Sequence, residues 1–470
     1  MKQIIQNTRH RLATLFLLVV AMIIPKVANA DVIQPSGDGT ADAPYQISNA
    51  AELYWFAEQV NSGNTKLNAK LTADIVVNEN VLDAKGDLNG DGAGFRVWTP
   101  IGLDEDGKKY EGTFDGQGHT ISGLYINDVG KSVVGLFCAT GTNSVIKNVG
   151  IIDSYFRAYQ HAAGICGSNG GVIDNCFSAA TCVVSRWYVG GVVSWNGGTI
   201  SNCHNVGKLT GGFNGAICSN NTNGTTTNCY YLEGTAYIGI YNGSGEATRK
   251  NASDFASGKV AWLLNGSEAG ESPAWRQTIG EDKYPVLDAA KGIVIYSTQI
   301  GLNPIIRPTA GILVGVSDVY NFAGIDGNKV YGIPQTGALA AEHPYVFTTN
   351  KDYVSFVPSD ENVTDDTPTC GLTGVLDPAG VKVYGKDNTA DADVSIVFTA
   401  TALNYASPKG TTVQYGKCYI NAEKCFLTSE LVSAMAKSIA NFGGESIILD
   451  VEISNATELY AFAKQVNNGN

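Results

Sequence analysis

Histidine, charged residues and long apolar runs are all scarce in this chain. It has 5 histidines in 470 residues, and charged side chains make up 16% of it. After residue 30 no apolar run approaches the roughly 20 residues that a membrane helix needs, so we expect no membrane insertion of the remaining chain. A His-Glu-x-x-His helix, a Gly-x-Ser-x-Gly turn and a phosphate-binding loop are also missing. Zinc peptidases, serine hydrolases of that type and P-loop nucleotidases depend on those motifs.

The net charge is −13 at pH 7. An acidic surface repels nucleic acid and anionic lipid, so we expect neither as a partner. Glycine is plentiful, with 55 residues, and such a chain can bury a large core through tight turns. The sequence therefore predicts a folded protein, and it offers no residues that call for a cofactor.

Residues 1–30 have the three zones of a secretory signal peptide. A basic start, "MKQIIQNTRHR", precedes the apolar run "LATLFLLVVAMII" and the small-residue end "KVANA". Cleavage is expected after Ala30. Position 31 is Asp31 rather than the cysteine of a bacterial lipid anchor. We therefore expect a secreted or cell-surface protein, and a signal anchor is the alternative.

An internal repeat predicts the fold. The copies are "SVIKNVGIID" (144–153), "GVIDNCFSAA" (171–180), "GTISNCHNVG" (198–207) and "GTTTNCYYLE" (224–233). Steps of 27, 27 and 26 residues separate their asparagines, Asn148, Asn175, Asn202 and Asn228. Short apolar triplets and glycine turns at this period predict the coils of a parallel β-solenoid, stacked roughly 4.8 Å apart. A weaker copy, "HTISGLYIND", places Gly123 at the asparagine position.

Stacked coils place equivalent residues in ladders along the axis. We expect structural ladders of the four asparagines, whose amides can hydrogen-bond along the axis, and of Cys176, Cys203 and Cys229, which follow Val149. A second cysteine row holds Cys138, Cys166 and Cys218, with Val193 in the gap. Cysteine is a small, frequently buried residue, so we interpret these positions as packing sites with free thiols. The pair Cys203–His204 supplies too few ligands for zinc.

Helical patterns flank the repeats. In "SNAAELYWFAEQVNSGN" (48–64), Asn49 and Glu52 resemble a capping box, and Leu53, Phe56 and Val60 share one face. A helix here is expected to cover the exposed edge of the first coil. Downstream, "SDFASGKVAWLLNG" and "WRQTIGEDKYPVLD" are expected to close the other end near residue 297.

These elements together resemble the GLUG-type repeats of bacterial surface proteins. The resemblance rests on the Gly-x-hydrophobic…Asn-Cys units and on "GDGTADAPYQISNAAELYWFAEQVN", "WTPIG", "GTFDGQGHTISGL" and "FASGKVAWLLNG…WRQTIGEDKYPVLD". It covers roughly residues 36–290. It implies a secreted or cell-surface protein of a Bacteroidetes-like bacterium, a right-handed parallel β-helix and an adhesive or binding role. It carries no catalytic residues over to this chain.

The whole chain is therefore predicted to be all-β, with a signal peptide at 1–30 and a parallel β-helix with capping elements at 31–297. Clustered β-formers between Gly, Asp and Pro turns predict an antiparallel, sandwich-like domain at 298–450. The final "EISNATELYAFAKQVNNGN" nearly repeats residues 46–64. It therefore predicts the start of a second capping helix at 451–470. A cap without coils to cover suggests that the chain is a fragment of a longer protein.

One calcium loop is weakly indicated. Asp87, Asn89 and Asp91 of "GDLNGDG" occupy the first three ligand positions, but Trp98 stands where the bidentate glutamate belongs. A glycine-rich polar turn is the alternative interpretation.

Three functions remain open: a non-enzymatic binding or adhesion protein directed at glycans or host and mucin surfaces, a polysaccharide lyase or glycoside hydrolase, and a passive stalk. No pair of carboxylates is placed for glycoside hydrolysis, because Asp153 and Asp174 fall at different positions of the coil. For binding, aromatic rings suit stacking on sugars. The candidates, each of which is alternatively a packing residue, are Tyr155, Tyr159, Trp187, Tyr188 and Trp195.

Overall fold

The computed structural model describes residues 32–422, except 106, 268–269, 271, 298–301, 327–328, 368, 386–392 and 399–402, and in addition residues 447–449. The signal peptide predicted at 1–30 and the second capping helix predicted at 451–470 lie outside the described residues.

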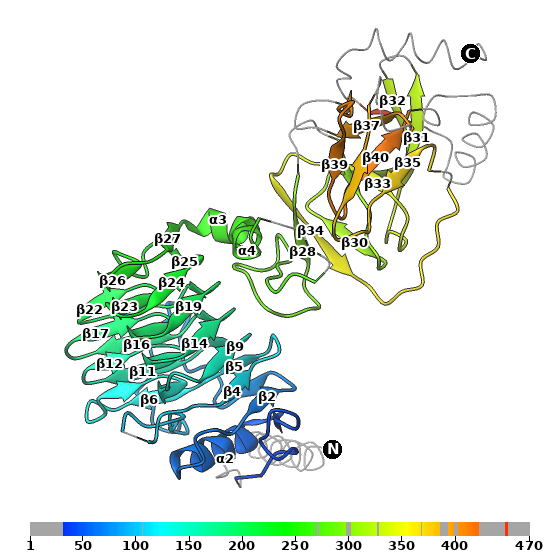
Figure 1. The fold of residues 1–470 in the computed structure, drawn as a ribbon. Helices are drawn as coiled ribbons and strands as arrows, with labels where there is room; N and C mark the ends of the chain where they lie inside the picture. Colours follow the sequence, from blue (N-terminus) through cyan, green and yellow to red (C-terminus); the bar gives the residue numbers. More distant parts are fainter. Residues whose placement is uncertain are drawn as a thin grey trace, which may run out of the picture.

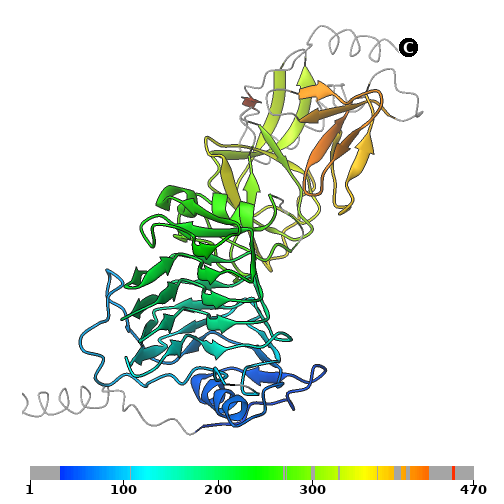
Figure 2. The ribbon, with the colours of Figure 1, turned by 60° about the vertical axis from the view of Figure 1, so that its left-hand side comes forward.

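Residues 45–250 wind into a β-solenoid of about seven coils, which confirms the predicted all-β repeat fold. Figure 2 shows the coils as layers of short arrows stacked along one axis. Five parallel sheets run along this axis, and one strand of a sheet comes from each coil it crosses. Every backbone group of an inner strand thereby pairs with the coils on both sides.

The two long sheets have seven strands each. The first is β1-β2-β4-β9-β14-β19-β24, with bounds Tyr45–Ile47, Ala69–Leu71, Thr113–Asp115, Val145–Lys147, Val172–Asp174, Thr199–Ser201 and Thr225–Thr227. The second is β27-β25-β20-β15-β10-β5-β3, with bounds Ala247–Lys250, Cys229–Leu232, His204–Asn205, Phe177–Ser178, Gly150–Ile152, Thr120–Ser122 and Ile75–Val76.

The three shorter sheets complete the coils. The third is β21-β16-β11-β6, with bounds Leu209–Thr210, Thr181–Val184, Tyr155–Ala158 and Tyr125–Asn127. The fourth is β22-β17-β12-β7, with bounds Phe213–Gly215, Tyr188–Gly190, His161–Ala162 and Val133–Val134. The fifth is β26-β23-β18-β13-β8, with bounds Ile240–Gly243, Cys218–Asn221, Val193–Asn196, Cys166–Asn169 and Phe137–Ala139.

Apolar ladders fill the interior of the solenoid. Ile146, Ile173 and Ile200 lie in register on β9, β14 and β19, and all three are fully buried. Alternation of buried and half-exposed positions in each triplet points the middle residue inward. Each fully buried isoleucine contributes roughly 1.5–3 kcal/mol, so a repeated apolar triplet stabilises the stack coil by coil.

The recurring asparagines occupy a turn that requires a left-handed backbone conformation. Asn148, Asn175, Asn202 and Asn228 each follow a strand of the first sheet, with φ of 55°, 49°, 51° and 48°. Asparagine is among the few non-glycine residues that tolerate this left-handed conformation. Their amides form the predicted ladder only in part. Asn228 Nδ2 donates to Asn202 Oδ1 at 2.8 Å, but Asn202 Nδ2 donates to the Asp174 carboxylate.

A different amide ladder is buried inside the solenoid. Asn169 Nδ2 donates to Asn196 Oδ1 at 2.8 Å, and Asn196 Nδ2 donates to Asn221 Oδ1 at 2.7 Å. These three asparagines close β13, β18 and β23 in the fifth sheet, and all are buried. The sequence signal was an asparagine before a glycine-rich turn, "NGG" in two coils and "NNTNG" in the third.

The main cysteine ladder lies in the core, whereas two other alignments were wrong. Cys176, Cys203 and Cys229 are buried free thiols, and Cys176 N donates to Cys203 Sγ at 3.4 Å. Burial raises the pKa of the Cys203 thiol well above its ordinary value. In the second row, Cys166, Val193 and Cys218 align as predicted, but Cys166 pairs with Phe137 rather than Cys138. Strand β8 enters one residue out of the counted register, so Cys138 is only half-buried.

Gly123 does not stand at the asparagine position. Strand β5 pairs with β10, so Ser122 lies against Ile152, and Gly123 is the counterpart of Asp153. Both take a left-handed φ, 78° and 43°. The coil that precedes Val145 is longer than one period, since Val145 pairs with Thr113. Subtracting one period from Asn148 therefore gives a residue in a different turn of the coil.

A helix forms where one was predicted before the first coils. Helix α2 spans Ala50–Asn61, and the Asn49 side chain accepts a hydrogen bond from Glu52 N. Leu53, Phe56 and Val60 are fully buried against the solenoid core. Figure 1 shows α2 at the end of the coils next to β2. Its role as a cap remains a prediction.

Residues 252–296 pack against the second sheet. Helices α3 (Ala252–Ala256) and α4 (Lys259–Leu264) bring Phe255 and Val260 into a cluster with Phe177 and Trp275. His204 lies beneath this segment. Cys203 faces the core and His204 the opposite side, where its ring stacks on Phe177 at 5.1 Å and its Nε2 bonds with Pro285 O at 2.9 Å. The pair is thus divided between two packing layers.

The rest of the described chain forms antiparallel sheets, as predicted. One is β28-β34-β30 (Ile293–Tyr296, Tyr353–Pro358, Gly311–Val314), and one is β29-β33-β31-β32-β41 (Asn303–Ile305, Tyr345–Thr348, Asp318–Asp326, Lys329–Gln335, Ile447–Leu449). The others are β35-β40-β37-β38 (Leu372–Gly374, Cys418–Asn421, Ser395–Phe398, Leu403–Tyr405) and β36-β39 (Val381–Val383, Thr411–Val413). The predicted boundary at 297 directly follows β28, which pairs with β34 across it.

Candidate functional site

A file of aromatic side chains, the aromatic strip, runs along the solenoid on the fourth and fifth sheets. Its members are His161, Tyr188, Phe213 and Tyr241, with Trp187 and Trp195 beside Tyr188. Strand register produces the file, since His161 on β12 pairs with Tyr188 on β17, and Tyr188 with Phe213 on β22. Parallel, in-register coils repeat one position at each step.

Most rings of the strip stack along the axis. The His161 and Tyr188 ring centroids are 5.7 Å apart at 25°, and those of Phe213 and Tyr241 are 4.9 Å apart at 21°. Trp195 instead stands at 85° to Tyr188, with centroids 5.7 Å apart. The faces of the stacked rings contact one another, whereas the plane of Trp195 is nearly perpendicular to that of Tyr188.

The strip is unusually open for aromatic residues. Trp187, Trp195, Phe213 and Tyr241 are 45%, 38%, 39% and 48% exposed. Single exposed apolar residues are ordinary, but a contiguous group on one surface marks an interaction site. Water covers these rings in the free protein, and a stacking ligand would displace it.

Trp187 is held in a conformation that aromatic residues avoid. Its φ is 70°, in the left-handed region, where an ordinary side chain costs roughly 1–2 kcal/mol. In the next coil the corresponding residue is Gly212, with φ 51°. The turn therefore suits glycine, and the tryptophan persists there against its backbone preference. Such strain concentrates at functional sites.

The structure gathers three of the five predicted aromatic residues. Trp187, Tyr188 and Trp195 lie together in the strip. Tyr159 is 37% exposed on the turn between β11 and β12, where its hydroxyl accepts from Arg186 Nη1 at 3.4 Å. Tyr155 belongs to the third sheet, where its half-buried ring stacks on Tyr125, so it is separate from the strip.

Sequence reasoning missed His161, Phe213 and Tyr241. The signal that could have found the first two is the repeat itself, because His161 precedes Tyr188 by 27 residues and Phe213 follows it by 25. Tyr241 lies in β26 of the fifth sheet, where the register places it opposite Ser219 rather than Phe213, so the repeat does not reveal it.

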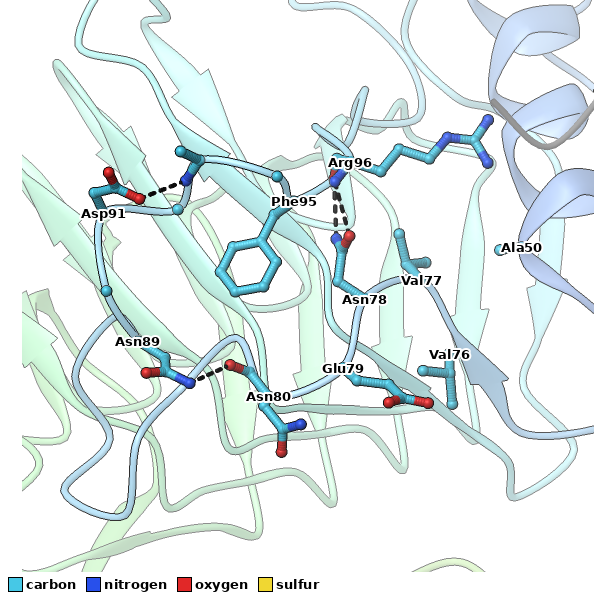
Figure 3. A pocket seen from close by; sticks show the side chains of 14 residues that line it. Ala50, Val76, Val77, Asn78, Glu79, Asn80, Asn89, Asp91, Phe95 and Arg96 are labelled. Atoms are coloured by element: carbon cyan, nitrogen blue, oxygen red, sulfur yellow. Dashed lines mark hydrogen bonds between the residues drawn. The ribbon is translucent and has the colours of Figure 1, made fainter. Parts of the chain in front are cut away.

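The predicted calcium residues contact different partners. Asp87 forms an ion pair with Lys208 Nζ, Asn89 Nδ2 donates to Asn80 O at 3.0 Å, and Asp91 accepts from Ala93 N at 2.9 Å. Figure 3 shows Asn89 and Asp91 on the loop that lines a hollow of about 740 Å³, with the two side chains turned apart. These contacts make a hydrogen-bonded polar turn, and calcium binding stays a prediction.

Neither a cluster of metal-ligating side chains nor a membrane-spanning helix is present among the described residues. No group of three or more His, Cys, Asp or Glu side chains is gathered to hold a metal ion there. Among the helices in the same residues, none combines the length and the apolar character that crossing a membrane requires.

Part of the chain is similar in sequence to two curated proteins. No protein-family model matches the chain. It is 31% identical over 159 residues to "Halomucin" of Haloquadratum walsbyi, a match that spans 33% of this chain and 2% of that protein. It is 30% identical over 163 residues to a "Putative Gly-rich membrane protein" of Evansella cellulosilytica, spanning 34% of this chain and 17% of that one.

Among solved structures, the chain is similar to a protein described as a "putative immunoglobulin A1 protease" from Bacteroides ovatus. The sequences are 18% identical, and the match covers 54% of this chain and 94% of that chain with a TM-score of 0.36. At that TM-score the likeness supports no argument about fold or activity. The chain is thus similar over about a third of its length to small portions of two much longer proteins.

Proposed function

We propose that this protein is a secreted or cell-surface, non-enzymatic binding protein of the GLUG type, and that its ligand is a glycan. The observation that carries the proposal is the aromatic strip, because exposed aromatic side chains on a rigid scaffold, Trp195 above all, can pack against the apolar C–H faces of sugar rings at little entropic cost. The solenoid is the scaffold that keeps the rings in place.

The setting of the strip supports this interpretation. The signal-peptide pattern of residues 1–30 favours export, and partial similarity to a halomucin and to a Gly-rich membrane protein is compatible with a surface location. The acidic chain, with a net charge of −13, disfavours anionic polymers as ligands. A right-handed winding and a capping role for α2 belong to the same proposal.

Removal of single rings tests the proposed function. Trp195→Ala is expected to weaken binding to an array of mucin-type and polysaccharide-derived glycans about 10-fold, since one aromatic contact is worth roughly 1–1.5 kcal/mol. Tyr237→Ala is the matched control, because Tyr237 is 92% exposed but lies outside the strip. Equal binding by both variants, or no glycan bound by the unaltered protein, contradicts the proposal.

Trp187→Gly separates binding from folding. It installs the residue that the next coil carries at this turn, Gly212, so the melting temperature is expected to stay the same or rise. Glycan affinity is expected to fall several-fold, because the ring is lost. A strongly lowered melting temperature would show instead that Trp187 is a packing residue.

A further inference from the structure

A groove with a mixed polar and apolar lining lies at one end of the aromatic strip. It has a volume of about 470 Å³ and is lined by Leu103, Asp104, Lys131, Ser132, Gln160 and His161, among others. His161 thus belongs to both the groove and the strip. The volume is within the range of small-molecule sites.

Strand register explains why the strip ends here. Val133 on β7 pairs with His161 on β12, so the coil before His161 has valine where the next coils have rings. Val133 also lines the groove. A ligand chain that follows the strip along the axis would meet this groove at the level of His161, where stacking contacts give way to polar ones.

The hydrogen bonds of His161 define its tautomer. The Ser194 hydroxyl donates its proton to Tyr188 O at 2.9 Å. The 3.2 Å contact between His161 Nδ1 and Ser194 Oγ therefore has Nδ1–H as its donor. Burial lowers the pKa of His161, which favours the neutral ring. Nε2 then carries a lone pair, and it can accept a hydrogen bond from a hydroxyl.

The charges of the groove are balanced. Asp104 and Lys131 contribute one charge of each sign to the lining, and the Asp104 carboxylate is held by Lys109 Nζ at 3.5 Å. The Gln160 amide and the Ser132 hydroxyl add further donors and acceptors. Such a mixture of balanced charges and neutral polar groups suits a ligand whose groups both donate and accept, as sugar hydroxyls do.

We propose that this groove binds the terminal residue of a neutral glycan chain, whose following residues lie along the aromatic strip, and that His161 Nε2 accepts a hydrogen bond from a hydroxyl of that terminal sugar. The inference rests on the proposed function and adds to it the ligand class, the direction of the chain along the solenoid axis and a preference for chain ends.

His161→Phe tests the hydrogen bond while it retains a ring that can stack on Tyr188. Binding is measured with neutral oligosaccharides and with the intact polysaccharides from which they derive, compared at equal sugar mass. The unaltered protein is expected to prefer the oligosaccharides, which have more ends. His161→Phe is expected to lower the oligosaccharide affinity about 3–10-fold, the loss of one net hydrogen bond, and to reduce that preference.

Two matched variants complete the experiment. His119→Phe makes the same change at a partly exposed histidine away from the groove and is expected to leave binding unchanged. Trp195→Ala should weaken oligosaccharides and polysaccharides alike. If Trp195→Ala weakens binding while His161→Phe does not, or if only acidic glycans bind, the groove proposal is wrong and the strip proposal survives. If no glycan binds the unaltered protein, both are wrong.

Discussion

Acidification from neutral pH is expected to destabilise the solenoid through His204. Burial lowers the pKa of His204 from 6.5 to about 3. Below pH 6.5 the unfolded chain therefore takes up a proton that the folded protein excludes, so the free energy of unfolding falls as the pH falls. The contribution of the neutral His204 to that free energy is complete only above about pH 6.5. The resulting decrease in the free energy of unfolding is about 4 kcal/mol near pH 3 and about 2 kcal/mol near pH 5.

The pKa of His204 is low because its imidazole ring is enclosed between the second sheet and the segment that packs on it. His204 is fully buried, with Phe177 on one side at 5.1 Å and Trp275 at 4.9 Å. Nε2 contacts Pro285 O, while Nδ1 has no partner among the described residues. A charge here would lack water and a counter-ion, which costs far more than a neutral imidazole.

His204→Phe is the variant that isolates this effect. Phenylalanine matches the stacking neighbours Phe177 and Tyr230, which occupy the same position in adjacent coils. At neutral pH the variant is expected to lose about 1–3 kcal/mol, because Pro285 O loses its partner. Between about pH 7 and pH 5 its urea midpoint should fall less than that of the unaltered protein.

The control for this prediction is His119→Phe, which changes a partly exposed histidine and should retain the full pH dependence. Carboxylates add their own acid sensitivity at lower pH. Hydrogen bonds lower the pKa of Asp115 and Asp365 despite burial, so their contribution is lost only as the pH falls through the range below their ordinary value near 3.8. An unchanged pH dependence in His204→Phe contradicts the assignment.

Asn196→Ala is expected to lower the free energy of unfolding by about 4 kcal/mol. The side chain is fully buried, accepts from Asn169 Nδ2 and Gly198 N, and donates to Asn221 Oδ1 and Gly198 O. Truncation leaves several buried groups without partners, each at a cost of about 1–3 kcal/mol. The measurement is the urea midpoint at neutral pH.

Asn223→Ala is the matched control for Asn196. It removes an exposed asparagine from the loop that follows β23 and should change the midpoint little. Combining Asn169→Ala with Asn196→Ala should cost less than the sum of the two, because both break the same hydrogen bond. A midpoint for Asn196→Ala equal to that of Asn223→Ala would show that the buried amide ladder contributes nothing.

Repeat spacing alone predicted the solenoid, because identical coils place identical residues in register. The apolar triplets, the main cysteine ladder and the turn asparagines followed from counting residues. Counting failed where a coil changed length. The coil before Val145 is longer, so Gly123 was assigned to the wrong turn, and Phe137 rather than Cys138 lines up with Cys166.

The period, the all-β coils, the helix at Ala50–Asn61 and three of the six aromatic residues of the strip could all be predicted from the amino-acid pattern. Which outward-facing positions are covered depends on how the chain packs in three dimensions. His204 and Trp195 both point away from the solenoid core, yet residues 252–296 bury His204, whereas Trp195 stays exposed. The repeat specifies direction relative to the axis, but burial of an outer face depends on a segment from elsewhere in the chain, and no periodicity encodes where that segment lies.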